Sequence, residues 1–206
     1  MESAKNLELE QILITSTSET YGTAQYVPIT EEHPLVGQSP YSASKIGADH
    51  IAISYYKSFN MPIKIVRPFN TYGPRMKPND GRVVSNFIVQ ALKNENLTLY
   101  GDGNQTRSFC FIDDMKDALI KLMDSNLKGP FNIGSNEEIS IIELAKLISK
   151  KLDKEVMIKF CEELEDEPRS RCPSITKILD ELNWSPKTSL NEGLSNTINF
   201  YRKILI

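Results

Sequence analysis

Apolar and polar positions along the chain follow two periods, one typical of buried strands and one of amphipathic helices. Residues 11–16 (QILITS) and residues 63–66 within MPIKIVRP are short apolar runs, which predict buried parallel strands. Between them, Ser39 and Pro40 predict a helix start, because serine caps free backbone amides and proline fits the first turn. Apolar positions at helical spacing continue that helix to Asn60. This order of elements is typical of an α/β fold.

The rest of the chain continues the alternation. Residues 69–81 contain two prolines and two glycines directly after a strand, and they predict a loop of the kind that carries functional residues. Ser140 and Glu143 stand at the start of an apolar stripe with the spacing of a capping box, which predicts a capped helix. Further strands are expected at residues 97–100, 108–111, 131–133 and 156–160, and further helices at residues 82–92, 113–123, 176–182 and 190–201.

Composition narrows the class of protein. The chain has 206 residues, of which 40% are hydrophobic, enough for one large domain or a large lobe with a small appendage. The net charge is -3 and no basic block occurs, so nucleic acid is not expected as a partner. Three cysteines at unrelated spacings predict neither disulfides nor a metal site, and His33 and His50 are expected to be structural. Without a membrane-spanning run or a signal peptide, the chain is expected to be soluble and cytoplasmic.

Tyr41 and Lys45 are four residues apart on the first predicted helix, so their side chains share one face about 5–6 Å apart at Cβ. A lysine ammonium beside a phenol stabilises the phenolate and lowers the tyrosine pKa. The phenol oxygen could then take a proton from a sugar or alcohol hydroxyl near neutral pH. Because such pairs also occur as ordinary solvated helix neighbours, the significance of this one depends on the motifs around it.

Three motifs supply that context. STSETYG at residues 16–22, YSASK at residues 41–45 and RPFNTYGPR at residues 67–75 have the order and spacing of the extended short-chain dehydrogenase/reductases. The chain resembles the NAD-dependent epimerase/dehydratase family of that class from about residue 11 to its end. The resemblance implies NAD as cofactor, a nucleotide-sugar substrate, and a homodimer that pairs through the Tyr41 helix.

The same resemblance implies a fold and a division into domains. Residues 1–75 would form the carboxyl-terminal part of a Rossmann-like doubly wound parallel sheet, that is, a partial dinucleotide-binding domain. Residues 76–206 would form a small α/β lobe that binds the nucleotide-sugar and returns one segment to the sheet.

Four residues are implied at the reactive end. Thr17 would hydrogen-bond the reacting sugar hydroxyl beside Tyr41, and Lys45 would hold the nicotinamide ribose while tuning Tyr41. Arg82 matches an arginine near the cofactor, so Thr17, Tyr41, Lys45 and Arg82 would all contact NAD. In the absence of the tyrosine motif, Thr17 would be interpreted as a strand-end hydroxyl that satisfies the backbone.

Glu19 helps to distinguish the possible reactions of the family from one another. A carboxylate can shuttle a carbon-bound proton next to a ketone, and the family's decarboxylases and dehydratases carry a glutamate here, whereas its epimerases generally do not. The alternative for Glu19 is a solvated loop acid. Ser18 replaces the aspartate of many glucose-nucleotide dehydratases, which counts against that subgroup without excluding the class.

Segments 70–92, 99–114 and 166–175 resemble UDP-glucuronate decarboxylases, whereas the segments around STSETYG and YSASK resemble sugar-nucleotide 4,6-dehydratases as much or more. We therefore expect an NAD-dependent nucleotide-sugar lyase that oxidises C4 to a 4-keto intermediate. Decarboxylation of a UDP-sugar is slightly favoured over 4,6-dehydration.

The resemblance also implies residues that hold the substrate. Arg107 and Arg171 would bind the diphosphate, because a guanidinium offers a fixed fork of donors to phosphate oxygens. For each of them, a surface ion pair is the alternative. The full set of matched substrate-binding positions is Asn70 and Asn86 near the diphosphate and sugar, Tyr100 and Gly101 beside the base, Arg107, and Arg171.

A G-x-G-x-x-G turn, which binds the cofactor pyrophosphate at a helix amino terminus, does not occur in the sequence. Its absence predicts that the chain is a fragment, a truncated reading frame, one half of a split enzyme or a remnant without activity. A separate chain would then supply the first half of the sheet and cover the edge near residues 12–14. A lobe that binds nucleotide-sugars without catalysis is therefore the second hypothesis, and an epimerase, disfavoured by Glu19, is the third.

Overall fold

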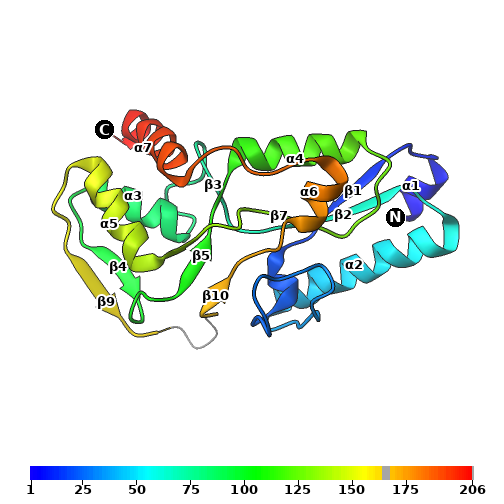
Figure 1. Cartoon of the computed structure of the whole chain (residues 1–206), viewed down its shortest axis with the longest axis horizontal. Helices are drawn as coiled ribbons and strands as arrows, with labels where there is room; N and C mark the ends of the chain where they lie inside the picture. The colour runs from blue at the N-terminus through cyan, green and yellow to red at the C-terminus, as the bar shows by residue number, and fades with distance from the viewer. Residues whose placement is uncertain (164–167, 206) are drawn as a thin grey trace.

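A parallel sheet with the strand order β1-β2-β7 forms one end of the computed structural model, which describes residues 1–163 and 168–205 (Figure 1). These strands are Ile12–Thr15, Ile63–Pro68 and Phe131–Ile133, and all pair in parallel. The central strand, β2, is buried along residues 63–67, as expected for a strand that is covered on both faces. The strands predicted at residues 11–16, 63–66 and 131–133 are confirmed.

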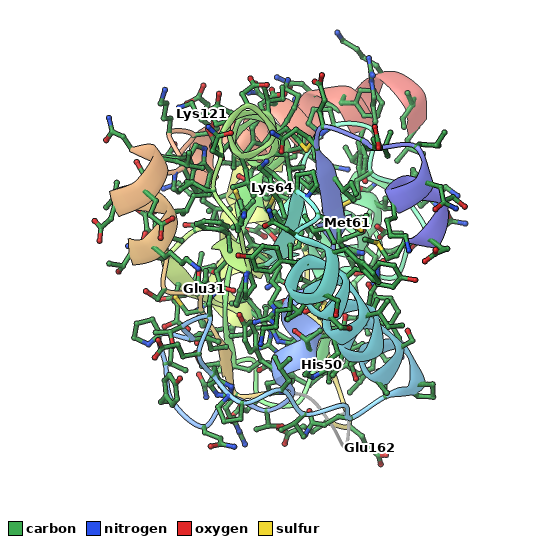
Figure 2. The ribbon with its side chains drawn as sticks, turned by 90° about the vertical axis from the view of Figure 1, so that its right-hand side faces the viewer. Glu31, His50, Met61, Lys64, Lys121 and Glu162 are labelled. Carbon is green, nitrogen blue, oxygen red and sulfur yellow. The ribbon has the colours of Figure 1, made fainter. Side chains whose placement is uncertain are left out.

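Helices cover both faces of this sheet, so the layers are those of a doubly wound α/β fold. Helix α2 (Pro40–Phe59) packs Ala52 against Ile63 and Ile65 on one face. On the other face, α4 (Ile112–Asp124) and α6 (Thr176–Leu182) pack against Val66 and β7. Figure 2 shows α2 and α4 on opposite sides of the strand that carries Lys64.

Local signals set the ends of α2 as the sequence predicts. The Ser39 hydroxyl accepts a hydrogen bond from the Ser42 amide, and the Ser42 side chain accepts one from the Ser39 amide, which completes a capping box before Pro40. The helix ends at Asn60, whose φ of 51° places it in the left-handed region. This start places Tyr41 in the first turn of the helix, beside the carboxyl end of β1.

The other end of the molecule is a smaller lobe with its own apolar core. Helices α3, α5 and α7 pack against the parallel pair β4 and β9 around buried residues such as Phe87, Leu99 and Leu144. Ser140 and Glu143 form the predicted capping box at the start of α5. The bounds are Val83–Leu92 for α3, Leu97–Tyr100 for β4, Ile141–Leu152 for α5, Ile158–Cys161 for β9 and Leu190–Leu205 for α7.

Residues 108–111 do not form the single strand that the sequence predicts. β5 (Thr106–Ser108) pairs with β8 (Glu138–Ser140) and β10 (Ser170–Arg171), whereas β6 (Cys110–Phe111) pairs with β3 (Thr71–Tyr72). The strand divides at Phe109 because its two halves join different sheets.

Other elements differ from the prediction at their ends or were not expected. β3 lies inside the segment predicted as a loop, and β9 begins two residues after the start of the predicted strand 156–160. Two short helical segments, α1 (Glu2–Asn6) and the 3-10 turn η1 (Ser18–Tyr21), were not predicted. The domain boundary expected at residue 75 stays a prediction, although β7 does return to the sheet of β1 and β2.

Three further observations concern membranes, metals and histidine. Across residues 1–163 and 168–205, each helix is too short or too polar to span a bilayer, and no group of three or more His, Cys, Asp or Glu residues is arranged to hold a metal ion.

His33 is buried, and its Nε2 accepts a hydrogen bond from the Gln25 amide at 2.9 Å. Its Nδ1–H therefore donates to the carbonyl of Pro34 at 2.8 Å, which is the structural role predicted for this residue.

Candidate functional site

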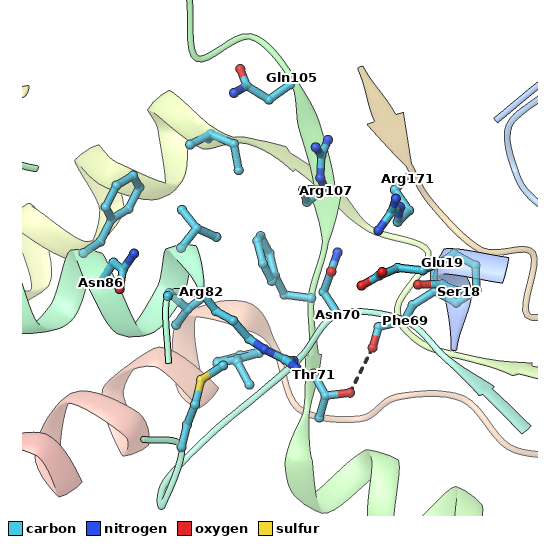
Figure 3. Close-up of a pocket in the computed structure, with 18 of the residues that line it drawn as sticks. Ser18, Glu19, Phe69, Asn70, Thr71, Arg82, Asn86, Gln105, Arg107 and Arg171 are labelled. Atoms are coloured by element: carbon cyan, nitrogen blue, oxygen red, sulfur yellow. Dashed lines mark hydrogen bonds between the residues drawn. The ribbon is translucent and has the colours of Figure 1, made fainter. Parts of the chain in front are cut away.

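A cavity of about 370 Å³ lies between the carboxyl ends of β1 and β2 and the smaller lobe (Figure 3). Clefts at the carboxyl ends of parallel strands are the usual binding sites of doubly wound folds. All of the predicted site residues except Lys45 and Gly101 line this cavity: Thr17, Glu19, Tyr41, Asn70, Arg82, Asn86, Tyr100, Arg107 and Arg171. Residues from six separate segments of the chain thus meet at one place.

Tyr41 and Lys45 lie side by side on α2, as their spacing predicts. The Tyr41 side chain is 49% exposed and borders the cavity, and the Lys45 ammonium lies 5.9 Å from the centroid of its ring. Lys45 Nζ donates a hydrogen bond to the Thr15 carbonyl at 2.9 Å. Lys45 therefore lies beside Tyr41 and joins α2 to the end of β1 through a hydrogen bond.

Thr17 and Glu19 are held in the cavity wall by the short turn η1. Thr17 caps this turn, since its hydroxyl accepts a hydrogen bond from the Glu19 amide at 3.3 Å, and its carbonyl accepts one from the Thr20 hydroxyl at 2.8 Å. Ser18 is buried, whereas Glu19 is exposed. Figure 3 shows the Glu19 carboxylate directed toward the part of the cavity that Asn70 borders. A carboxylate and a phenol thus approach the same space.

Another part of the cavity wall is cationic. Arg107 on β5 and Arg171 on β10 are paired residues of parallel neighbouring strands, so their side chains leave the same face of the sheet into the cavity. Arg107 is buried, and its Nη1 donates to the Thr106 carbonyl at 2.7 Å. Two guanidinium groups in a partly desolvated wall form a favourable site for a polyanion such as a diphosphate.

The remaining predicted residues lie in the wall or at its margin. Asn70 donates a hydrogen bond to the Ser108 carbonyl at 3.2 Å, which fixes its side chain at the end of β2. Arg82 precedes α3 with a largely exposed side chain, 3.8 Å from an Asp80 carboxylate oxygen, and Asn86 lies one turn further along. Gly101 lies just outside the cavity wall. Its φ of 69° lies in the left-handed region, which favours glycine, and its amide donates to the Cys161 carbonyl at 3.0 Å.

Several cavity residues were not predicted from the sequence. Gln105 is buried and donates a hydrogen bond to the Tyr100 carbonyl at 2.8 Å, so it fixes the bend after β4. Strand alternation was a usable signal for Gln105, because residues two apart on a strand face the same side and Arg107 was already selected. Thr98, Phe87 and Met76 also line the cavity, but core and surface residues of these types have the same sequence signature.

Comparison with known proteins places these residues in a family context. Residues 1–197 match the protein family described as GDP-mannose 4,6 dehydratase. The chain is 43% identical over 198 residues to UDP-glucuronic acid decarboxylase 2 of Arabidopsis thaliana, a match that covers 94% of this chain and 44% of that protein. The chain therefore spans about half the length of the curated relatives it matches.

Solved structures agree on the fold. UDP-glucuronic acid 4-epimerase from Bacillus cereus, in complex with UDP-glucuronic acid and NAD, superposes with a TM-score of 0.92 at 31% identity over 98% of this chain and 65% of that one. dTDP-glucose 4,6-dehydratase from Bacillus anthracis, in complex with NAD, superposes with a TM-score of 0.90 at 32% identity over the same shares.

Proposed function

We propose that this chain, which belongs to the GDP-mannose 4,6 dehydratase family of NAD-dependent epimerases and dehydratases, is the substrate-binding and proton-transfer part of a nucleotide-sugar lyase. The single observation that carries the proposal is the cavity itself. It is lined both by Thr17, Glu19 and Tyr41 and by the Arg107–Arg171 pair. Proton-transfer groups and diphosphate-binding groups therefore share one space.

The substrate would be a UDP-sugar with its diphosphate at Arg107 and Arg171. Tyr100 and Gln105 border the cavity on the same side and would face the base, while Asn70 would contact the sugar between the two ends. UDP-glucuronate is the favoured substrate because the curated relatives are named UDP-glucuronic acid decarboxylases.

The residues at the carboxyl end of β1 fit the nicotinamide end of NAD. Tyr41 and Thr17 both line the cavity, and Lys45 lies beside Tyr41 on the same helix face with its ammonium on the Thr15 carbonyl. Together with Arg82, these residues would hold the cofactor. NAD+, when bound, would accept a hydride from sugar C4 and return it later.

The chain's own residues would then move the protons. Tyr41 would take the proton of the C4 hydroxyl, and Thr17 would orient that hydroxyl by a hydrogen bond. With a carboxylate on C5, the C5–C6 bond breaks and carbon dioxide leaves. The electron pair of the broken bond passes into the C4 ketone and forms an enolate. Protonation at C5, for which Glu19 is a candidate acid, restores the ketone before C4 is reduced again.

A 4,6-dehydratase is the second candidate, and the similarity to the dTDP-glucose 4,6-dehydratase structure is the observation that favours it. On a sugar with a hydroxymethyl group, Glu19 would remove the C5 proton as hydroxide leaves C6. A third candidate, a lobe that binds the nucleotide-sugar without catalysis, uses only the Arg107 end of the cavity.

Two measurements on the 206-residue chain test these proposals. Calorimetric titration with UDP and with NAD+ separates a binding lobe, which takes UDP alone, from a chain that also holds the cofactor. Incubation with NAD+ and UDP-glucuronate, in the presence of a chain that supplies the glycine-rich turn, is then expected to release UDP-xylose and carbon dioxide. A 4-keto-6-deoxy sugar from UDP-glucose or dTDP-glucose would instead identify a dehydratase, and a chain that binds no UDP would refute the proposed function.

A further inference from the structure

Outside the cavity, a charged pair lies buried between α2 and the central strand. Arg67 Nε on β2 lies 3.1 Å from Asp49 Oδ2 on α2, and their side chains are 3% and 0% exposed. Neither residue lines the cavity. The proposed chemistry therefore does not use this pair directly.

The Arg67 guanidinium also contacts the turn that carries Glu19. Its Nη1 donates to the Tyr21 hydroxyl at 3.0 Å and to the Glu31 carbonyl at 3.3 Å, and its central carbon lies 5.0 Å from the Tyr21 ring centroid. The Tyr21 hydroxyl donates in turn to Asn132 Oδ1 on β7 at 2.6 Å. We call Asp49, Arg67, Tyr21 and Asn132 the Arg67 network.

Each segment that supplies a reactive residue also supplies a member of this network. Asp49 lies two turns beyond Tyr41 on the same face of α2, about 12 Å along the axis at 1.5 Å per residue. Tyr21 ends η1 two residues after Glu19, and Arg67 precedes Asn70 by three residues at the end of β2. One guanidinium thus fixes α2 and η1 to the strand between them.

The stability of the fold does not explain why this pair is buried. A buried ion pair is weak evidence for stability, because apolar residues of similar volume often serve as well or better. Within residues 1–163 and 168–205, the second oxygen of the Asp49 carboxylate also has no hydrogen-bond partner. What apolar residues cannot reproduce is the direction of the Arg67 fork, which donates to a helix and to a turn at once.

From these contacts we infer that Arg67 is a positioning residue for the proposed reaction, acting through Asp49 and Tyr21 to hold the Tyr41 helix and the Glu19 turn in register. The inference rests on the proposed function for the identity of the reactive groups. It adds that η1 and α2 depend on the Arg67 network directly. β10 is joined to it indirectly, through Ile29, whose carbonyl accepts a hydrogen bond from Asn132 and whose amide donates one to the Cys172 carbonyl.

The test compares the wild type with a double variant, Arg67→Met with Asp49→Leu, which removes both buried charges together. The matched control is Lys121→Met with Asp117→Leu, which removes an exposed ion pair on α4. Thermal melting checks that each variant is folded. Hydrogen exchange of residues 17–22 and 39–45 and the affinities for UDP and UDP-glucuronate are then measured.

The double variant is expected to melt close to the wild type, but its exchange at residues 17–22 and 39–45 should be at least about tenfold faster, as the loss of a charge-assisted hydrogen bond allows. UDP should lose less affinity than UDP-glucuronate, because β10 is joined to the network indirectly, through Ile29, so any preference for UDP-glucuronate over UDP should fall toward one. Unchanged exchange in those two segments, or an equal change in the control, would overturn the inference.

Arg67→Lys keeps the positive charge and decides the matter if the double variant does not fold. Lysine cannot donate to Asp49 and Tyr21 with the geometry of a fork, so faster exchange at residues 17–22 is expected again. If the wild type binds no UDP, the proposed function fails, whereas the exchange measurements still support or refute the role of Arg67.

Discussion

Gly193 on α7 packs against Tyr72, a residue of the cavity wall, so an alanine there is expected to disturb the site. A Cβ at this position would run into the Tyr72 hydroxyl and would lie 2.8 Å from Phe111 Cδ2, closer than real Cβ contacts. Tyr72 is 2% exposed, and its hydroxyl donates a hydrogen bond to the Leu190 carbonyl of α7 at 3.4 Å, so a shift of the ring would break this contact. The Gly193→Ala variant is therefore expected to be overpacked.

Gly47 on α2 is the matched control, because a Cβ there would meet no atom within 4 Å. Both substitutions gain the helix preference of alanine over glycine, about 0.8–1.0 kcal/mol. Only Gly193→Ala adds an overpacking cost of about 1–3 kcal/mol. Both variants gain the same helix preference, so it cancels in the comparison. Their free energies of unfolding should therefore differ by the overpacking cost alone, about 1–3 kcal/mol.

Urea denaturation followed by circular dichroism measures this difference, provided that the m-values agree. Gly47→Ala should be more stable than the wild type. In a Tyr72→Phe background, which removes the hydroxyl, the penalty of Gly193→Ala should shrink, and a double-mutant cycle would report that coupling. If Gly193→Ala and Gly47→Ala were equally stable, the packing argument for this wall would be wrong.

Three more predictions concern the site and the core. Glu19→Gln should lower product formation from the nucleotide-sugar about a hundredfold or more while leaving UDP affinity unchanged, because a general acid or base is lost; similar turnover would favour an epimerase. Arg107→Met should weaken UDP binding about tenfold or more by calorimetry, whereas Lys121→Met, on exposed α4, should not change it. Burial, aided by the negative charge of Asp114, raises the pKa of the Cys110 thiol from 9.0 to about 12. The unfolded thiol therefore loses its proton first, so the free energy of unfolding should fall as pH rises above about 9, and less so in Cys110→Ala, by thermal melting.

Elements with local signals were predictable from the sequence. Ser39 with Pro40, the Ser140–Glu143 capping box and the apolar run 131–133 each define an element within a few residues, and the structure confirms all three. The division of residues 106–111 at Phe109 was not predictable in this way. It depends on β10, whose two residues lie more than sixty positions away along the chain.

The candidate site shows the same limit. The types of its residues followed from motifs, but the adjacency of Arg107 and Arg171 follows from strand pairing that no local pattern encodes. Asp49 shows this limit more clearly. Its spacing from Tyr41 and Lys45 places all three residues on one helix face, but this spacing does not reveal which of them is buried. In the sequence Asp49 has the pattern of a solvated acid, and only the packing of α2 against β2 shows that it is buried on Arg67.

The walls of the cavity differ in how they are built, and this bears on the proposed reaction. The wall proposed to hold the nucleotide includes residues of a lobe with its own apolar core, whereas the wall proposed to hold the sugar includes η1 and α2, which contact the Arg67 network. Structures similar to this chain include an epimerase and a dehydratase at almost the same TM-score, so the fold alone does not select the chemistry. Under the proposed function, selection must then come from the few side chains that would reach the sugar. Ser18 and Glu19 both line the cavity from one turn, the first with a buried hydroxyl and the second with an exposed carboxylate. Because that turn is held by Tyr21, a change at Arg67 should alter the reaction without a change in nucleotide preference.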